Sequence, residues 1–494
     1  MNFKKILMMF FVLFLICISN KNVYAVDTIP TEEQQEAFEK RKTLPVETNE
    51  IEGWPNGSLI GAESAVVIDV NTGTVIYSKN PHEKMFPAST TKILTGLLVI
   101  ENCGMDETVT FSRDAIWNID RDSTHLAIDV GEKMSVKDCL YGLLLASANE
   151  VAYGLAEHVG GDLDTFVQMM NDRAAAIGCT DTHFANANGL PNDNHYTSAH
   201  DLALIAKECF ANETFCSIAS TVDYTIASTN LQSETRHITN HHRMLPGLKH
   251  EYEGCLGGKT GFTRAARQTL VTCAERDGMR LVCVVMKDES PYQFLDTISL
   301  LDYAFDSFQK MNIAENEKRY NLDSHSFYKT DFDILGSSAP ILSINPTGNV
   351  IVPRSTNFDS LSVELDYSND STSDKIAQMR YFIGGNYIGE TSLEKAKSDV
   401  KPKEFSDVLT KTENVNIRKI EADHPIIFIN VKQVAIVSIC IIAVIFIVLF
   451  TIDQIRRYAE SARRNQKLTR TRYKKRSENQ VRVFRRKGDR DERF

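Results

Sequence analysis

The strongest pattern of apolar and polar positions along the chain is a pair of β-hairpins that lie far apart in the sequence. Two runs rich in β-branched residues, 65–70 and 74–77, flank an Asn-Thr-Gly turn. Two longer runs, 268–274 and 279–286, flank an Arg-Asp-Gly turn. Short β-rich runs around such turns predict antiparallel hairpins. We therefore expect one antiparallel sheet that takes strands from both ends of this region.

The segment between the two hairpins has helical spacing. Apolar residues recur every three to four positions in the segments 91–100, 136–145, 150–159 and 163–177. A further segment, 297–311, follows the second hairpin and is expected to cover the sheet as a final helix. The pattern predicts an α/β domain with a helical insert, which we place at residues 58–311. The preceding residues 26–57 are polar and acidic, and we expect a leader with at most one loose helix.

After residue 312 the pattern changes to short strand-like runs separated by turns. These runs contain no cluster of catalytic residue types and lie at 339–344, 349–352, 361–365 and 379–387. They predict a small all-β domain at 312–391, expected as a sandwich. The polar stretch 392–433 that follows is interpreted as a stalk.

Both ends of the chain carry apolar segments. A short run at 6–18 follows two lysines and precedes a small-x-small cleavage pattern, which predicts a secretory signal peptide at residues 1–25. The run is short for an uncleaved anchor, which is the alternative. Residues 434–452 form a continuous uncharged run long enough to cross a membrane as a helix. A buried core helix is the alternative there, but it would show polar periodicity.

Charge is divided unevenly along the chain. The formal net charge of the 494 residues is −10, yet residues 453–494 contain 16 lysines and arginines against 6 acidic residues. Because a lysine and arginine excess beside a span marks the cytoplasmic side, we expect the acidic body outside the cell and this tail in the cytoplasm. The tail is interpreted as a flank that sets topology. Binding to anionic lipid is an alternative, and we expect no nucleic-acid partner.

The cysteines do not follow a disulfide or zinc pattern. Of ten, Cys17 and Cys440 lie in the apolar end segments, and eight are scattered over the large exported part. An even number permits disulfides, but this distribution does not resemble a small disulfide scaffold. Cys273 and Cys283 lie in apolar strands and are expected to be buried thiols. No CxxC or histidine-rich spacing indicates zinc, and we expect neither a metal nor a cofactor.

Ser89 and Lys92 open the first long helix. Their spacing places a hydroxyl and an amine on one helix face, one turn apart. A neutral lysine there can accept the hydroxyl proton, provided that burial and neighbouring cations depress its pKa. The N-terminus of the helix and nearby backbone N–H groups favour a developing oxyanion. The S-x-x-K pattern alone is weak, because ordinary surface serines also head it, at Ser307, Ser326, Ser392 and Ser398.

Two further short motifs carry candidate chemistry. Ser147 and Asn149 lie in a polar break between two helical patterns, where the hydroxyl could relay a proton and the amide could hold a substrate carbonyl. A helix cap or loop pair is the alternative. Lys259, Thr260 and Gly261 come just before the second hairpin. The first two could bind a terminal carboxylate, and the glycine would let a substrate backbone lie against the strand, whereas a plain turn is the alternative.

The order and spacing of the three motifs strengthen each of them. S-x-x-K at a helix start, S-x-N 58 residues later and K-T-G a further 112 residues on form a serine acyl-transfer set. Over about residues 57–310 the sequence resembles the low-molecular-mass penicillin-binding proteins, specifically the serine-type D-alanyl-D-alanine carboxypeptidases. The supporting segments are 86–92, 187–190, 195–199, 240–245 and 258–263. The later β-rich part resembles the family's C-terminal β-sandwich only weakly.

The resemblance implies a β-lactamase/transpeptidase-like α/β fold and an acyl-enzyme mechanism without a metal. The implied site comprises Ser89 as nucleophile, Lys92 as general base, Ser147 and Asn149 as the second motif, Lys259, Thr260 and Gly261 at the carboxylate pocket, and the backbone N–H groups of Ser89 and Phe262 as the oxyanion hole. The implied substrates are peptidoglycan stem peptides that end in D-Ala-D-Ala, and β-lactams are implied as covalent inhibitors.

The sequence departs from the family pattern at the rim of the expected cleft. Glu150 stands after the second motif where an aspartate or its equivalent is usual, and Arg267 stands where relatives often have glycine. His241 or Arg243 could add positive charge near the carboxylate pocket, although a solvated loop is the simpler interpretation of either. None of these differences touches a reacting atom.

Two other functions would use the same three motifs. A class A β-lactamase needs a glutamate for deacylation, and no E-x-x-L-N segment lies between Asn149 and Lys259. A non-catalytic penicillin-binding sensor or wall-binding protein would keep the acylatable serine without turnover. The sequence leaves this second alternative open.

Overall fold

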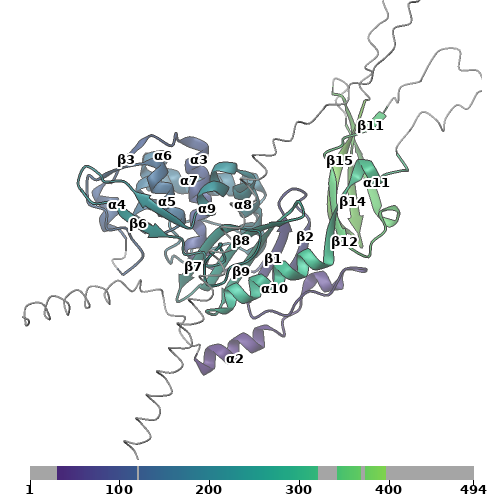
Figure 1. The fold of residues 1–494 in the computed structure, drawn as a ribbon, viewed down its shortest axis with the longest axis horizontal. Helices are drawn as coiled ribbons and strands as arrows, with labels where there is room; N and C mark the ends of the chain where they lie inside the picture. Colours follow the sequence, from purple (N-terminus) through teal and green to yellow (C-terminus); the bar gives the residue numbers. More distant parts are fainter. Residues whose placement is uncertain (1–30, 120–121, 321–341, 369–372, 396–494) are drawn as a thin grey trace, which may run out of the picture. The chain divides into compact units, whose positions relative to one another are not determined.

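The computed structural model describes residues 31–119, 122–320, 342–368 and 373–395 (Figure 1). The expected signal peptide, membrane span and basic tail lie outside these residues. Within the described residues, no helix is long and apolar enough to cross a membrane.

A five-stranded antiparallel sheet joins the two distant hairpins. Its order is β2-β1-β9-β8-β7, and its strands are β1 (Ser64–Asp69), β2 (Val75–Lys79), β7 (Cys255–Thr263), β8 (Arg267–Arg276) and β9 (Met279–Asp288). The central pair, β1 with β9, runs in register from Ser64 opposite Met286 to Asp69 opposite Leu281. The prediction of one sheet from both hairpins is therefore confirmed. Asp277 and Gly278, at φ of 53° and 73°, form the positive-φ turn expected between β8 and β9.

Alternate residues of the internal strand β1 face two different hydrophobic cores. Val66 and Ile68 belong to the core shared with the helical insert. Ala65 and Val67 belong to the core on the other face, where α10 (Tyr292–Ser307) packs on β9 and β8. Figure 1 shows α10 running along the sheet on the side away from the insert. Because both faces are covered, the strand is a continuous apolar run rather than an alternating one.

The four helices expected in the insert are all present. They are α3 (Lys92–Asn102), α5 (Val136–Leu144), α6 (Asn149–Gly160) and α7 (Leu163–Ile177). The insert also contains elements that periodicity did not indicate: α4 (Arg113–Trp117), α8 (Ala199–Ala211), α9 (Glu213–Ala219), and the two-stranded pairs β3 (Thr108–Thr110) with β4 (Lys133–Ser135) and β5 (Asp223–Ile226) with β6 (Arg236–Thr239). The N-cap of α8 was a usable signal, since the Ser198 side chain accepts from the N–H of Asp201.

The expected final helix at 297–311 is wrong at its C-terminal end. α10 stops at Ser307, and the next residues form β10 (Phe308–Asn312). This strand is the edge of a six-stranded antiparallel sheet in the order β10-β12-β15-β14-β13, with β11 paired to β15. The other strands of the sheet are β11 (Leu342–Ile344), β12 (Asn349–Pro353), β13 (Ser362–Tyr367), β14 (Lys375–Ile383) and β15 (Asn386–Lys395). The short helix α11 (Ile313–Asn316) follows β10.

The small β-rich domain differs from the expected sandwich. Over the described residues its strands form one sheet rather than two, because β11 and β12 both pair with β15. Buried side chains of this sheet, such as Val350 and Tyr381, belong to the same hydrophobic core as Phe308 and Trp54. In the part of this region that the structure describes, the apolar face of the sheet is therefore buried without a second sheet.

The leader helix is packed rather than loose. α2 (Glu32–Arg41) starts with a capping box formed by Thr31 and Gln34. The Phe38 ring is buried and stacks on Tyr292 at 4.0 Å between centroids. One turn later, the Arg41 side chain donates to the backbone oxygen of Gly61 at 2.7 Å. The expectation of a loose helix missed this packing because it depends on two positions of one helix face that meet distant residues.

The eight cysteines that lie in described residues are free thiols. Cys273 and Cys283 are buried in β8 and β9 as expected, and burial raises the pKa of both thiols. Protonated buried thiols of this kind are chemically inert. Cys103, Cys179 and Cys216 are only partly buried.

Candidate active site

Ser89 lies in a single 3₁₀ turn, η2 (Ala88–Thr91), that leads directly into α3. The turn is held against the sheet, since the Thr269 hydroxyl of β8 donates to the backbone oxygen of Pro87 at 2.9 Å. Ala88 has a φ of 51°, a conformation that costs free energy for a residue with a side chain. The backbone beside Ser89 is therefore strained and supported from the sheet.

Strand β7 passes unusually close to this turn at Gly261. A Cβ at that position would lie 2.3 Å from Thr269 Oγ1 and 3.0 Å from the backbone nitrogen of Ser89. We expected the glycine to make room for a substrate backbone. The structure adds a second reason, because the backbone of η2 already occupies the space that a side chain would need.

The amine of Lys92 is enclosed by three oxygen atoms. Its Nζ lies 3.0 Å from Ser89 Oγ, 2.7 Å from Asn149 Oδ1 and 2.6 Å from the backbone oxygen of Asn188. The side chain has no exposed surface. The structure thus brings together the serine and lysine of the first motif and the asparagine of the second.

These three contacts suit a neutral amine. The oxygens of Asn149 and Asn188 are carbonyl acceptors, so each takes one N–H of Lys92. A neutral amine has two hydrogens and one lone pair, and the lone pair then faces the Ser89 hydroxyl. Burial, and secondly the positive charge of Lys259, hold the pKa of Lys92 well below its usual value, with Glu150 opposing them. A lysine can act as a base here only if burial and a nearby cation depress its pKa, and both are present at Lys92.

The K-T-G residues lie on β7 next to this cluster. Lys259 is buried, and burial lowers its pKa to about 7. Its Nζ donates to the backbone oxygen of Thr260 at 3.0 Å. Phe262, one residue past the glycine, is 54% exposed. A buried cation thus lies on the same strand as an exposed aromatic ring and the glycine that touches η2.

The second motif occupies the turn between α5 and α6. Ser147 is buried at a φ of 61°, and Asn149 is the first residue of α6. The backbone N–H of Asn149 donates to the oxygen of Thr124 at 2.9 Å, and the Glu150 carboxylate accepts from the N–H of Leu126. The loop around residues 124–126 is therefore fastened to the start of α6. Glu150 has a structural function that its position after the motif did not reveal.

Asn188 and Gly189 are site residues for which the sequence suggested no function. The segment 187–190 supported the resemblance, but its geometry was not predictable. Gly189 has a φ of 82°, and a Cβ there would lie 1.8 Å from the backbone oxygen of Ala88. The glycine lets this loop close on η2, so that the neighbouring carbonyl of Asn188 reaches Lys92.

His195 supports the same turn from behind. Its Nδ1 accepts from the N–H of Ala185 at 3.0 Å, which places the proton of the neutral ring on Nε2. That Nε2–H donates to Thr91 Oγ1 at 2.8 Å. Burial, with smaller effects of His183 and Lys92, lowers the pKa of His195 to about 3, so the ring is neutral at pH 7. His195 positions the residue that precedes Lys92 and touches no reacting atom.

The departures at the rim have structural explanations. Arg267 has a φ of 55°, a region in which glycine is unstrained, which fits a position where relatives often have glycine. Its guanidinium pairs with Glu289 and lies over the Phe262 ring, 5.8 Å from the centroid.

The side chain of His241 is exposed, and its backbone N–H donates to Leu145 at 3.2 Å. Desolvation of the ring, and secondly the charges of Lys259 and Arg243, lower the pKa of His241 to about 4. The ring is therefore neutral at pH 7 and adds no positive charge near the carboxylate pocket, although its surroundings are not those of a fully solvated loop.

Comparison with known proteins gives one consistent family. A model of the family described as D-alanyl-D-alanine carboxypeptidase matches residues 52–290. The D-alanyl-D-alanine carboxypeptidase DacF of Bacillus subtilis is 31% identical over 364 residues, which cover 71% of this chain and 89% of that protein. DacB2 of Mycobacterium tuberculosis, another D-alanyl-D-alanine carboxypeptidase, is 32% identical over 49% of this chain and 82% of its own length.

One solved structure supports the fold at lower sequence identity. Penicillin binding protein 5 of Haemophilus influenzae aligns with 69% of this chain and 98% of its own, at 23% identity and a TM-score of 0.55. The likeness concerns the fold alone.

Replacing Gly189 by alanine will disable the site, while the same change at Gly161 will not. Both glycines have positive φ, 82° and 83°, but a Cβ at Gly161 has nothing within 4 Å. We expect Gly161→Ala to lower the free energy of unfolding by about 1 kcal/mol and Gly189→Ala by roughly 2–5 kcal/mol, because overpacking adds to the backbone penalty. Urea unfolding and labelling of Ser89 by a fluorophosphonate measure the two effects. Equal results for both variants would contradict the contact with Ala88.

Proposed function

The chain belongs to the D-alanyl-D-alanine carboxypeptidase family of serine-type hydrolases, and we propose that it removes the terminal D-alanine from peptidoglycan stem peptides through an acyl-enzyme on Ser89. The observation that carries the proposal is the buried Lys92 amine, 3.0 Å from Ser89 Oγ with two carbonyl acceptors for its hydrogens. β-Lactams would acylate the same serine.

Acylation begins with proton transfer from the Ser89 hydroxyl to the neutral amine of Lys92. The Oγ attacks the carbonyl carbon between the two D-alanines, and the backbone N–H groups of Ser89 and Phe262 would hold the oxyanion. The C–N bond then breaks. The leaving D-alanine takes a proton, supplied from the Lys92 ammonium through the Ser147 hydroxyl.

In deacylation, a water molecule is the nucleophile and Ser89 Oγ is the leaving group. Lys92 removes a proton from water, the hydroxide attacks the ester carbon, and the proton returns to Ser89 Oγ as the C–O bond breaks. The products are free D-alanine and the shortened stem peptide. No redox step occurs, and the residues named here supply every proton transfer.

The specificity for a C-terminal residue would come from β7. Lys259 and Thr260 would bind the substrate carboxylate, and burial strengthens this interaction when Lys259 is charged. The Asn149 side chain would donate from Nδ2 to the carbonyl of the preceding residue, since its Oδ1 accepts from Lys92. The close approach of β7 to η2 at Gly261 keeps this strand beside Ser89, where the strand-like backbone of the substrate would lie.

We further propose that the enzyme acts outside the cell. The support is the pattern of residues 1–25 as a signal peptide, 434–452 as a span and 453–494 as a basic cytoplasmic flank. Protease added to intact cells is expected to degrade the 58–311 domain and to spare an epitope tag at the C-terminus. Protection of the domain would contradict this orientation.

Ser89→Ala is expected to abolish release of D-alanine from diacyl-Lys-D-Ala-D-Ala by the full-length protein. The loss should be roughly 10⁴-fold or more, because the hydroxyl forms the covalent bond. Ser307→Ala is the matched control, since Ser307 also heads an S-x-x-K pattern but lies at the end of α10. If the wild type and Ser89→Ala both release D-alanine, Ser89 is not the nucleophile. Labelling of Ser89 by penicillin without D-alanine release would favour a sensor, and rapid turnover of penicillin would favour a β-lactamase.

The pH profile should report Lys259. A lysine binds a carboxylate only while protonated, so kcat/KM for the peptide is expected to fall about tenfold per pH unit above its pKa of about 7. Bound carboxylate favours the charged lysine, so the descending limb of kcat should lie at higher pH. In Lys259→Arg, where the cation does not titrate, the limb near pH 7 should disappear. A kcat/KM that stays flat between pH 7 and 9 in the wild type would contradict this assignment.

A further inference from the structure

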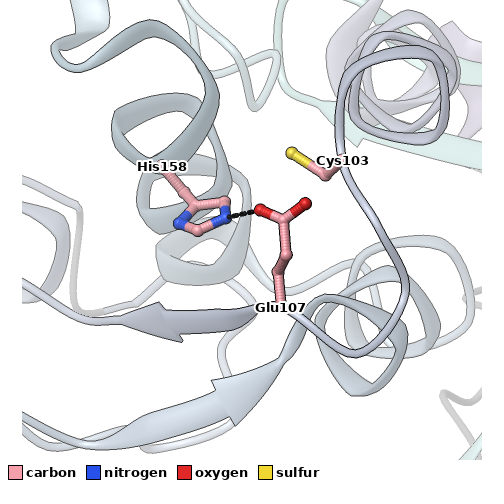
Figure 2. Close-up of side chains that lie close together, drawn as sticks. All are labelled: Cys103, Glu107 and His158. Carbon is pink, nitrogen blue, oxygen red and sulfur yellow. Dashed lines mark hydrogen bonds and ion pairs between the residues drawn. The ribbon is translucent and has the colours of Figure 1, made fainter.

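Three side chains with different ligand atoms meet on the insert, away from the serine site. Cys103 caps the C-terminus of α3, Glu107 immediately precedes β3, and His158 lies in the last turn of α6. Figure 2 shows the His158 ring and the Cys103 thiol both directed toward the Glu107 carboxylate. One ligand atom of each lies within 4.8 Å of the other two. The cluster is partly exposed, so a solute ion can reach it.

The carboxylate at the centre of the cluster is held in place. Glu107 Oε2 lies 3.0 Å from His158 Nε2, and its Oε1 accepts from the N–H of Gly104 at 2.6 Å. The backbone of Glu107 is fixed on both sides, by its N–H to Gly104 and by the N–H of Val136 to its oxygen. Such support orients a ligand before a metal binds.

We propose that Cys103, Glu107 and His158 form a binding site for a divalent zinc-like cation. Thiolate, imidazole and carboxylate are together the donor set that Zn²⁺ prefers, and three protein ligands leave a fourth, tetrahedral position for water. Metal–ligand distances of about 2.0–2.3 Å put tetrahedral ligands roughly 3.5 Å apart. Ligand atoms up to 4.8 Å apart would therefore approach by about 1.3 Å at most, and the His158 Nε2–Glu107 Oε2 pair at 3.0 Å would separate slightly. Side-chain rotation supplies movements of this size.

Binding changes the protonation of two ligands. At neutral pH a cysteine side chain that binds no metal is mostly a thiol. The metal takes the thiolate and releases that proton to solvent. His158 binds through Nε2 with its proton on Nδ1, and the His158–Glu107 hydrogen bond is replaced by two bonds to the metal.

The position of the site connects it to the catalytic helices. α3 and α6 carry Lys92 and Asn149 at their N-terminal ends, joined by the 2.7 Å hydrogen bond. The same helices carry Cys103 and His158 at their other ends. At a rise of 1.5 Å per residue, the metal would lie roughly 16 Å along α3 from Lys92. A bound ion would link the far ends of the two helices that hold the catalytic amine.

A cobalt titration of the purified full-length protein tests the site without using turnover, so its result is independent of the proposed function. Co²⁺ replaces Zn²⁺ and gives a thiolate-to-cobalt charge-transfer band only when sulfur is a ligand. We expect one equivalent to produce the band in the wild type, Cys103→Ser to abolish it, and excess Zn²⁺ to displace it. His158→Gln and Glu107→Gln should weaken binding by more than the roughly 10–100-fold that loss of an outer-shell partner costs.

Two matched variants control for nonspecific effects. Cys216→Ser removes another partly buried thiol. His237→Gln removes the histidine of an exposed pair with Asp223, which no cysteine among the described residues joins in a cluster. Both should keep the band, and circular dichroism should show all variants folded. Absence of the band in the wild type, or its persistence in Cys103→Ser, would overturn the proposal.

Discussion

The site depends on the burial of the Lys92 amine beside only two carbonyl acceptors, one fewer than a charged ammonium group needs for its three hydrogens. Among the described residues, Lys79, Lys92 and Lys259 are buried. Lys79 and Lys92 differ in the atoms that surround the amine. Lys79 Nζ donates to three backbone oxygens, those of Arg41, Ile60 and Ala62, which suits an ammonium. Lys92 has two carbonyl acceptors and one hydroxyl, which suits an amine. Burial lowers the pKa of both, and the third neighbour determines what each one can do.

The other elements of the domain serve to place these neighbours. The start of α6 supplies Asn149, the loop at 187–190 supplies the carbonyl of Asn188, and η2 supplies Ser89. Each comes from a different part of the chain, and each is held by contacts that involve no reacting atom, such as the His195–Thr91 hydrogen bond. This explains why so much of the insert is rigid packing around a small reactive centre.

Local pattern was sufficient for much of this structure. Hairpins and long helices show in the sequence because their periodicities involve neighbouring residues, and Ser89 with Lys92 lie one helical turn apart. The carbonyl of Asn188 could not be predicted, since every residue has one and only the fold selects it. The packing of Phe38 and the single sheet after residue 308 depend likewise on distant partners. No rule of sequence spacing predicts that Cys103, Glu107 and His158 lie together (Figure 2).

The pairing of β1 with β9 makes folding depend on the order in which the chain becomes available. Ser64 faces Met286, so the centre of the sheet forms between segments more than 200 residues apart. Until β9 is present, β1 has an open edge and apolar side chains on both faces, which is a template for wrong pairing. A chain cut between β6 and β7 is therefore an open-edged hairpin attached to helices that have no complete sheet to cover, rather than a smaller enzyme.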